Sequence, residues 1–215
     1  MKKNILYFFS IIAFSFGASS SNLPNDVRLY VCPQALFKFH PTFDDILKEL
    51  IQRDPDGRIV LINDTIDGSY KKLLLKRWTL KYPEIIPHTI FIPRMSQEKF
   101  MGLLTVADAL LDIPSFSGGN SSLEAFSVGA PIVTWPHNFM RSRVTSAFYK
   151  QMGLTKLIAR DSASYVDLAL KLAQNKNFYR QMQTDIKANA HRLYETADTI
   201  REIETFFLDA HEAWQ

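Results

Sequence analysis

Residues 109–124 have the sequence ALLDIPSFSGGNSSLE, and this stretch decides the fold. It begins with a short, mostly apolar run at 109–112, which is typical of a strand covered on both faces. A loop containing Gly118 and Gly119 follows, and residues 122–128 have the composition of a helix. A strand, a loop and a helix in this order are typical of a parallel sheet flanked by helices.

The same alternation of short apolar runs and helix-periodic segments extends over the chain from Val27 onward. It predicts an α/β domain with a Rossmann-like parallel sheet and flanking helices. The expected strands span residues 28–32, 58–63, 89–93, 109–112, 131–135 and 156–159. The expected helices span residues 42–53, 97–105, 122–128, 165–174, 177–194 and 199–214. The expected N-caps of the first four helices are Thr42, Ser96, Ser121 and Ser164.

The composition fits a globular domain that binds neither nucleic acid nor metal. Of 215 residues, 47% are hydrophobic and 22% are charged, which is enough apolar surface for a real core. The 25 basic and 22 acidic residues are scattered, so we expect no nucleic-acid partner. The single cysteine, Cys32, excludes an internal disulfide, and the five histidines lack metal-ligand spacing.

The first 22 residues differ from the rest of the chain. Lys2 and Lys3 precede an apolar run at 5–16 and a group of small residues, a pattern typical of a secretory signal peptide. The run is short for a bilayer span, so we expect no stable membrane anchor. The alternative interpretation is a remnant of an upstream domain. In both cases residues 23–215 are the expected domain.

In open parallel sheets, ligands bind where the carboxyl ends of the strands face the amino ends of helices. Backbone N–H groups and the helix dipole converge there on negative charge. We therefore expect the functional site among the strand-to-helix loops, which span residues 33–41, 63–68, 93–96, 113–121 and 136–141.

The diglycine loop, residues 113–121, has the features of a phosphate-binding segment. Gly118 and Gly119 allow a ligand to approach the backbone closely. Asn120 and Ser121 then lead into a helix whose free N–H groups are suited to bind a diphosphate. The alternative interpretation is an ordinary tight turn.

Glu124 lies one turn into that helix and fits two interpretations. With Ser121 it forms a capping-box pattern, in which its carboxylate accepts the first N–H of the helix. It is also placed to accept hydrogen bonds from ribose hydroxyls, as acidic residues do in dinucleotide-binding folds. The two roles do not exclude each other.

Lys38 follows the first expected strand in the segment CPQALFKFHP. A lysine in this loop is suited to neutralise the charge that builds on a leaving diphosphate. Gln34 in the same segment is suited to hydrogen-bond a phosphate or a sugar, and we interpret His40 as structural. The alternative for Lys38 is a surface lysine without a role.

Four separated strings of the sequence are YVCPQALFKFHPTFDDIL, FIPRMSQEKF, VADALLDIPSFSGGNSSLEAFSVGAPIVTWP and SRVTSAFYKQMGL. In this order and spacing they resemble the carboxyl-terminal lobe of the O-linked N-acetylglucosamine transferase and Spindly-like glycosyltransferases. The resemblance covers nearly everything from Val27 to the carboxyl terminus.

The resemblance implies a GT-B glycosyltransferase that transfers a sugar to serine or threonine hydroxyls of an acceptor polypeptide. It implies a UDP-sugar donor, in the first place UDP-GlcNAc, with inversion, no metal and no cofactor. It assigns the diphosphate contact and a catalytic role to Lys38, with Gln34 beside it. The remaining donor contacts that it implies are Arg94 and Met95 for uracil, Gly118, Gly119, Asn120 and Ser121 for the phosphates, and Glu124 for the ribose.

The chain also departs from that family. The family's histidine and threonine pair in the phosphate loop appears here as Gly119 and Asn120, and a family histidine after the uracil loop appears as Phe100. The family's amino-terminal lobe has no counterpart in these residues, so we expect half an enzyme with weak UDP binding and little transfer alone.

Two rival functions stay open at the level of sequence. One is an inactive nucleotide-binding remnant, and the other is a different GT-B sugar-nucleotide enzyme such as an epimerase. The location stays open as well: the resemblance favours the cytoplasm, whereas a true signal peptide in residues 1–22 means export.

Overall fold

The computed structural model describes residues 23–24, 26–63, 68–194 and 197–214. Five strands in these ranges form one sheet, with every neighbouring pair parallel, in the order β3-β2-β1-β4-β5. They are β1 (Leu29–Cys32), β2 (Arg58–Ile62), β3 (Thr89–Ile92), β4 (Ala109–Leu111) and β5 (Ile132–Val133). The Rossmann-like parallel sheet is confirmed. The signal-like segment, residues 1–22, lies outside the described residues.

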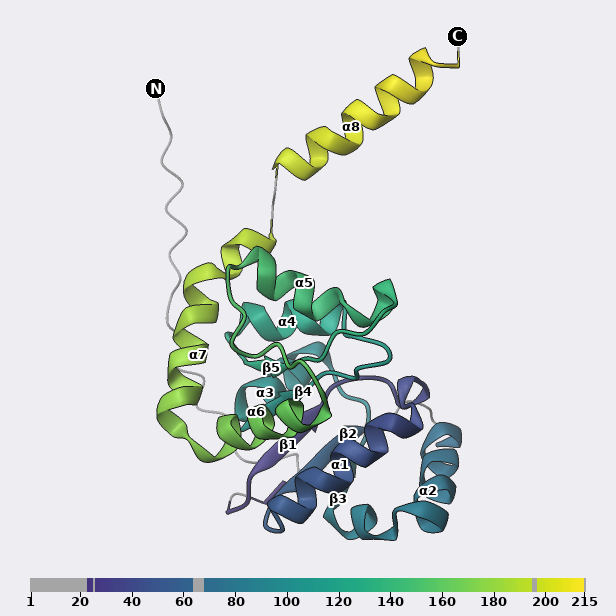
Figure 1. Cartoon of the computed structure of the whole chain (residues 1–215), viewed down its shortest axis with the longest axis vertical. Coiled ribbons are helices and arrows are strands. Elements are labelled where there is room, and N and C mark those ends of the chain that lie inside the picture. Colours follow the sequence, from purple (N-terminus) through teal and green to yellow (C-terminus); the bar gives the residue numbers. More distant parts are fainter. Residues whose placement is uncertain (1–22, 25, 64–67, 195–196, 215) are drawn as a thin grey trace.

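Helices flank this sheet, with α1 beside α6 and α3 beside α4 (Figure 1). The helices of the described ranges are α1 (Pro41–Arg53), α2 (Ser69–Lys81), α3 (Gln97–Val106), α4 (Asn120–Ser127), α5 (Val144–Gln151), α6 (Ser162–Gln174), α7 (Lys176–Asn189) and α8 (Ala197–Glu212). The last of them, α8, projects away from the body that contains the sheet (Figure 1). Short 3-10 turns are η1 (Leu36–Lys38), η2 (Pro83–His88), η3 (Met140–Ser142) and η4 (Ala190–Leu193). No helix in the described ranges is long and apolar enough to cross a membrane.

The helix expected at residues 42–53 is confirmed as α1, and its apolar side chains are part of the core. Phe43, Leu47 and Leu50 of α1 are fully buried, and Phe43 packs edge-on against Tyr165 of α6 at 6.3 Å between ring centres. The N-cap is His40 rather than the expected Thr42. Pro41 occupies the first helical position, where a missing N–H costs nothing, and this moves the start of the helix back.

Two further helix starts test the expected N-caps. Ser96 accepts a hydrogen bond from the Lys99 N–H at 3.4 Å, which confirms it as the N-cap of α3. The expected N-cap Ser164 is wrong, because α6 begins earlier, after Asp161. Asp161 and Ser164 form a reciprocal capping box there, so Ser164 occupies its third helical position.

Two elements differ from the expected pattern. The strand expected at 156–159 is reduced to a single parallel bridge between Thr134 and Ile158. Helix α2 was not expected, since only Leu74 and Trp78 of its thirteen residues are buried and its apolar period is weak. Most of the preceding loop, residues 64–67, lies outside the described residues.

Candidate functional site at the carboxyl edge of the sheet

Two loops at the carboxyl ends of adjacent strands form the candidate site. Strand β1 leads through Gln34 into η1, which ends at Lys38, and β4 leads into the diglycine loop and α4. Since β1 and β4 are neighbours in the sheet, these two loops leave the same edge side by side. The fold thus brings together Gln34 and Ser121, which are 87 residues apart in the sequence.

A chain of hydrogen bonds joins the two loops. The Lys38 ammonium donates to Gln34 Oε1 at 2.8 Å, and Gln34 Nε2 donates to Ser121 Oγ at 2.7 Å. Gln34 is 4% exposed, so this amide is held between two fixed partners. Three of the residues predicted for the diphosphate site are therefore connected directly.

The two glycines of the loop have different surroundings. A Cβ at Gly118 would lie 2.3 Å from Ser122 Oγ and 2.5 Å from Gln34 Nε2, so only glycine lets Gln34 pack against the loop. A Cβ at Gly119 would meet no atom within 4 Å. Close packing within the protein explains Gly118, and the open side of the loop lies at Gly119.

The amino end of α4 offers backbone donors. The N–H groups of Gly119, Asn120 and Ser121 have no hydrogen-bond acceptor among the described residues. Gly119 is the N-cap and supplies no capping side chain. These donors and the positive end of the helix dipole suit an anion. The N–H of Gly118 is already used, because it donates to Asp112 Oδ1 at 2.8 Å.

The Lys38 ammonium lies in a partly apolar setting. Its Nζ is 4.4 Å from the centre of the Phe116 ring. Burial lowers the pKa of Lys38, and the nearby Asp112 carboxyl opposes this effect. The cation is thus partly stripped of water before a ligand arrives, which strengthens its attraction for a nearby anion.

Asp112, which the sequence pattern predicts only as the end of a strand, is a central residue of the site. It is 2% exposed and accepts hydrogen bonds from Ser117 Oγ at 2.7 Å and Thr134 Oγ1 at 2.7 Å, besides the one from Gly118. Burial raises the pKa of this carboxyl. An aspartate directly after an apolar strand and before a glycine loop was the available signal.

Thr145 of α5 holds the loop from the other side and was also missed. Its Oγ1 lies 2.8 Å from Ser117 Oγ and 2.8 Å from Ser122 Oγ, and its N–H donates to Ser117 Oγ at 3.0 Å. All three side chains are buried. The loop that presents the α4 amides is therefore fixed by a closed polar network.

The capping interpretation of Glu124 is wrong in this structure. Helix α4 begins at Asn120, and Ser121 Oγ is engaged by Gln34. Glu124 instead accepts a hydrogen bond from Gln97 Nε2 at 3.4 Å, at the start of α3. The expected cap Ser121 is therefore wrong as well, and Glu124 faces the segment that follows Arg94 and Met95.

Arg94 and Met95 lie in the loop between β3 and α3. Arg94 is exposed, and Met95 is half-buried against the core. The contact between Gln97 and Glu124 places the start of α3 beside α4. The predicted uracil loop, at Arg94 and Met95, therefore leads into the helix that neighbours α4, on which the predicted ribose residue Glu124 lies.

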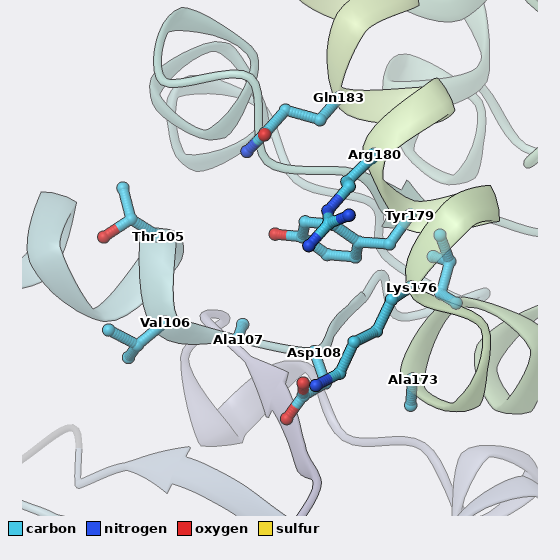
Figure 2. Close-up of a pocket in the computed structure, with 10 residues that line it drawn as sticks. Thr105, Val106, Ala107, Asp108, Ala173, Lys176, Tyr179, Arg180 and Gln183 are labelled. Carbon is cyan, nitrogen blue, oxygen red and sulfur yellow. The ribbon is translucent and has the colours of Figure 1, made fainter.

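Two cavities lie elsewhere. One of them has a volume of about 280 Å³ and is lined among others by Asp108, Lys176 and Tyr179, which Figure 2 shows as sticks. Asp108 directly precedes β4, so this cavity is at the amino end of the strand, opposite to Lys38. The second, of about 290 Å³, lies between α5 and α7. Neither includes a predicted site residue, and the described residues contain no group of three or more side chains placed to hold a metal ion.

Solved structures with this architecture show that the fold is that of a GT-B glycosyltransferase lobe. The Thermobaculum terrenum O-GlcNAc transferase matches with a TM-score of 0.72 and 22% identity, over 86% of this chain and 38% of that one. TarM matches with a TM-score of 0.64 and 14% identity, over 87% of this chain and 37% of that one. The carboxyl-terminal domain of a group 1 glycosyl transferase (LpcC) from Francisella tularensis matches with a TM-score of 0.52 and 15% identity, over 80% of this chain and 85% of that one.

The family follows from the sequence. The model of glycosyl transferase family 41 matches residues 14–202, and the chain belongs to this family. A UDP-N-acetylglucosamine–peptide N-acetylglucosaminyltransferase of Caenorhabditis elegans is 21% identical over 76% of this chain and 14% of its own length. The probable enzyme SEC of Arabidopsis thaliana is 22% identical, over 86% and 19%. The chain thus spans 14% and 19% of these two curated relatives.

Proposed function

We propose that this chain is the UDP-sugar-binding lobe of a protein O-glycosyltransferase. In this proposal the donor is UDP-GlcNAc, the acceptor is a serine or threonine hydroxyl of a polypeptide, and transfer proceeds with inversion and without a metal. The observation that carries the proposal is the hydrogen-bonded chain Lys38–Gln34–Ser121, which ends beside the free amides of α4.

The donor would bind along this edge of the sheet. The diphosphate lies between the Lys38 ammonium and the N–H groups of Gly119, Asn120 and Ser121, which together supply one charge and three backbone donors. Glu124 accepts from the ribose hydroxyls, and the backbone at Arg94 and Met95 receives the uracil. The contact between Gln97 and Glu124 supports this order of subsites.

In this proposal the main task of the lobe is to stabilise the charge that develops on the leaving UDP. When the acceptor oxygen attacks the anomeric carbon from the face opposite the diphosphate, the bond from that carbon to the UDP oxygen breaks. The electron pair leaves on UDP, whose charge Lys38 and the α4 amides stabilise in the transition state. The acceptor proton passes to a base.

A second lobe would supply that base and align the acceptor. Alignment of two reactants contributes up to about 7–11 kcal/mol to lowering a barrier in favourable cases. The isolated chain is therefore expected to bind UDP weakly and to transfer sugar slowly or not at all. The family relatives, which extend far beyond the matched region, support this division of labour.

Titration calorimetry of UDP against the purified chain tests the binding step. Lys38→Ala should weaken UDP binding at least about tenfold, equal to about 1.4 kcal/mol. Lys150→Ala is the matched control, because Lys150 is an exposed lysine on α5 away from this edge. Equal affinities for the wild type and Lys38→Ala would refute the role of Lys38.

Product analysis tests the reaction. The chain is incubated with UDP-GlcNAc and an acceptor peptide, with and without a separately expressed amino-terminal lobe of a family 41 relative. Peptide glycosylation that requires the added lobe supports the proposal. Rapid transfer by the chain alone contradicts the half-enzyme interpretation. An epimerised donor identifies a different GT-B enzyme, and UDP binding with no product under either condition favours an inactive remnant.

A further inference from the structure

The cavity of Figure 2 is a recess at the amino edge of the sheet, and several polar side chains meet in it. It has a volume of about 280 Å³ and lies between the end of α3, the start of β4 and the first turns of α7. Leu172 and Ala173 of α6 form its apolar part. Its polar part consists of Asp108, Lys176, Tyr179, Arg180 and Gln183 (Figure 2).

These polar groups lack partners within the part of the chain that the structure describes. One carboxylate oxygen of Asp108 accepts the Leu29 N–H at 2.8 Å, and the other accepts no hydrogen bond from a described residue. The same absence of hydrogen bonds and ion pairs holds for the side chains of Lys176, Tyr179, Arg180 and Gln183. Polar groups in a fold normally bind protein or ordered water. A recess with this many unused donors and acceptors is suited to a polar ligand.

The charged groups of the recess are close enough to influence one another. Burial raises the pKa of Asp108, and the nearby Lys176 ammonium is one of the groups that oppose this effect. Burial also raises the pKa of Tyr179, and the Asp108 carboxylate adds to the rise. Figure 2 shows the side chains of Lys176 and Asp108 pointing toward each other. The carboxylate, the ammonium and the phenol therefore surround one space.

The second cavity, between α5 and α7, differs in its charges. Its lining contains Lys156 and Asp185, which form an ion pair at 3.6 Å. Asp185 also accepts a hydrogen bond from Gln181 at 2.8 Å. The charges of that cavity therefore neutralise each other. In the recess, by contrast, Lys176 and Arg180 face one carboxylate, which leaves an excess of positive charge for an anionic ligand.

We propose that the recess binds a small phosphorylated polyol of about the size of a monosaccharide phosphate. The Arg180 guanidinium and the Lys176 ammonium hold the phosphate, because a guanidinium offers paired N–H donors and the ammonium adds a second charge. The positive end of the α7 dipole lies at the same place. The free oxygen of Asp108, the Tyr179 hydroxyl and the Gln183 amide bind the ligand's hydroxyl groups, which both donate and accept.

The size and the position of the recess separate it from the donor site. Small-molecule sites have volumes of about 300–1,000 Å³. A recess of about 280 Å³ therefore accepts one sugar ring with its phosphate and excludes a whole nucleotide. Asp108 directly precedes β4 and Asp112 directly follows it, so the recess and the candidate donor site lie at opposite edges of the sheet. The two ligands should bind without competition.

Titration calorimetry of the purified chain tests the assignment, with glucose-6-phosphate, inorganic phosphate and glucose as probes. We expect glucose-6-phosphate to bind at least about tenfold more tightly than either of the other two probes. Lys176→Ala/Arg180→Ala should weaken its binding at least about tenfold. The matched control is Lys150→Ala/Arg160→Ala, which removes the same two charges from α5 and from the segment before α6 and should retain the affinity. Tyr179→Phe should weaken the binding of glucose-6-phosphate and leave that of inorganic phosphate unchanged.

UDP affinity, measured on the same samples, distinguishes this site from the donor site. The Lys176→Ala/Arg180→Ala variant should keep its UDP affinity, and Lys38→Ala should keep its affinity for glucose-6-phosphate. Thermal denaturation without ligand verifies that each variant is folded. Loss of UDP binding in every sample would refute the proposed function and leave the recess assignment standing.

Three results would overturn the assignment of the recess. The first is a wild type without saturable binding of glucose-6-phosphate. The second is binding that Lys38→Ala abolishes and Lys176→Ala/Arg180→Ala retains, since the phosphate would then occupy the donor site. The third is sedimentation with phosphatidic acid vesicles, which carry the same phosphate monoester on a lipid, in place of binding to the free sugar phosphate.

Discussion

The buried carboxylate of Asp112 accepts the N–H of Gly118 at 2.8 Å, and this contact fixes the bend that presents the α4 amides. Asp112 directly follows β4, whereas Gly118 is part of the turn six residues later. The same carboxylate also binds Thr134, so the position of the loop is set from within the sheet. The candidate donor site is thus held by a residue that does not itself face the ligand.

Removing the Asp112 carboxylate should therefore destabilise the fold. Asp112→Ala leaves the Gly118 N–H and the Thr134 hydroxyl buried without an acceptor, at about 1–3 kcal/mol each. We expect the free energy of unfolding, measured by urea denaturation, to fall by about 3 kcal/mol. Asp112→Asn keeps an acceptor for Gly118 and should lose about 1 kcal/mol or less. Equal losses in the two variants would argue against this network.

The two glycines should respond differently to a methyl group. Gly118→Ala forces Ser122 or Gln34 to move, which should cost about 1–3 kcal/mol of stability and weaken UDP binding. Gly119→Ala meets no neighbour and adopts φ −109°, so its stability should change by less than about 0.5 kcal/mol. Thermal denaturation of both variants is the measurement. If Gly118→Ala is as stable as the wild type, Ser122 and Gln34 can move aside without cost, and the packing argument for Gly118 is wrong.

UDP binding should depend on pH through Lys38. The pKa of Lys38 is lowered in the free protein. Its ammonium therefore begins to lose its proton at a lower pH than an ordinary lysine, whose pKa is about 10.4. A bound diphosphate raises the pKa of Lys38. Between the pKa of the free protein and that of the complex, binding is therefore accompanied by proton uptake, and the affinity for UDP falls as the pH rises. Calorimetry in buffers of different ionisation enthalpy measures the uptake. Lys38→Arg should abolish it, and any titration of UDP itself is common to both proteins. Identical uptake in the two proteins would exclude Lys38 as the source.

Glu124 should contribute to the nucleoside part of the ligand and not to the phosphates. Glu124→Gln should lower the affinity for UDP about tenfold, through weaker hydrogen bonds to the ribose, and leave inorganic pyrophosphate unaffected. Glu49→Gln on α1 is the control for removing one exposed carboxylate. Competition titrations with both ligands give the comparison, and an equal loss for both would place Glu124 at the diphosphate.

Much of the fold follows from local patterns, because short apolar runs between helical periods are characteristic of parallel sheets. The proximity of Lys38 and Gly118 also follows, since both come after strands of one sheet. The roles of Asp112 and Thr145 do not, because their partners belong to segments that only the folded chain brings together. Helix α2 escaped detection since its exposed side carries leucines as well as lysines, which obscures the apolar period. His40 displaced Thr42 as N-cap because the proline between them starts the helix.

The orientation of the Gln34 amide gives the site a built-in indicator of charge. Its oxygen faces a cation and its nitrogen faces a hydroxyl, an arrangement that a neutral amine at position 38 would no longer enforce. The amide protons of Gln34 should therefore shift in a nuclear magnetic resonance spectrum whenever the lysine loses its proton or changes partner. A single side chain inside the protein would then report, without any label on the ligand, when the donor arrives.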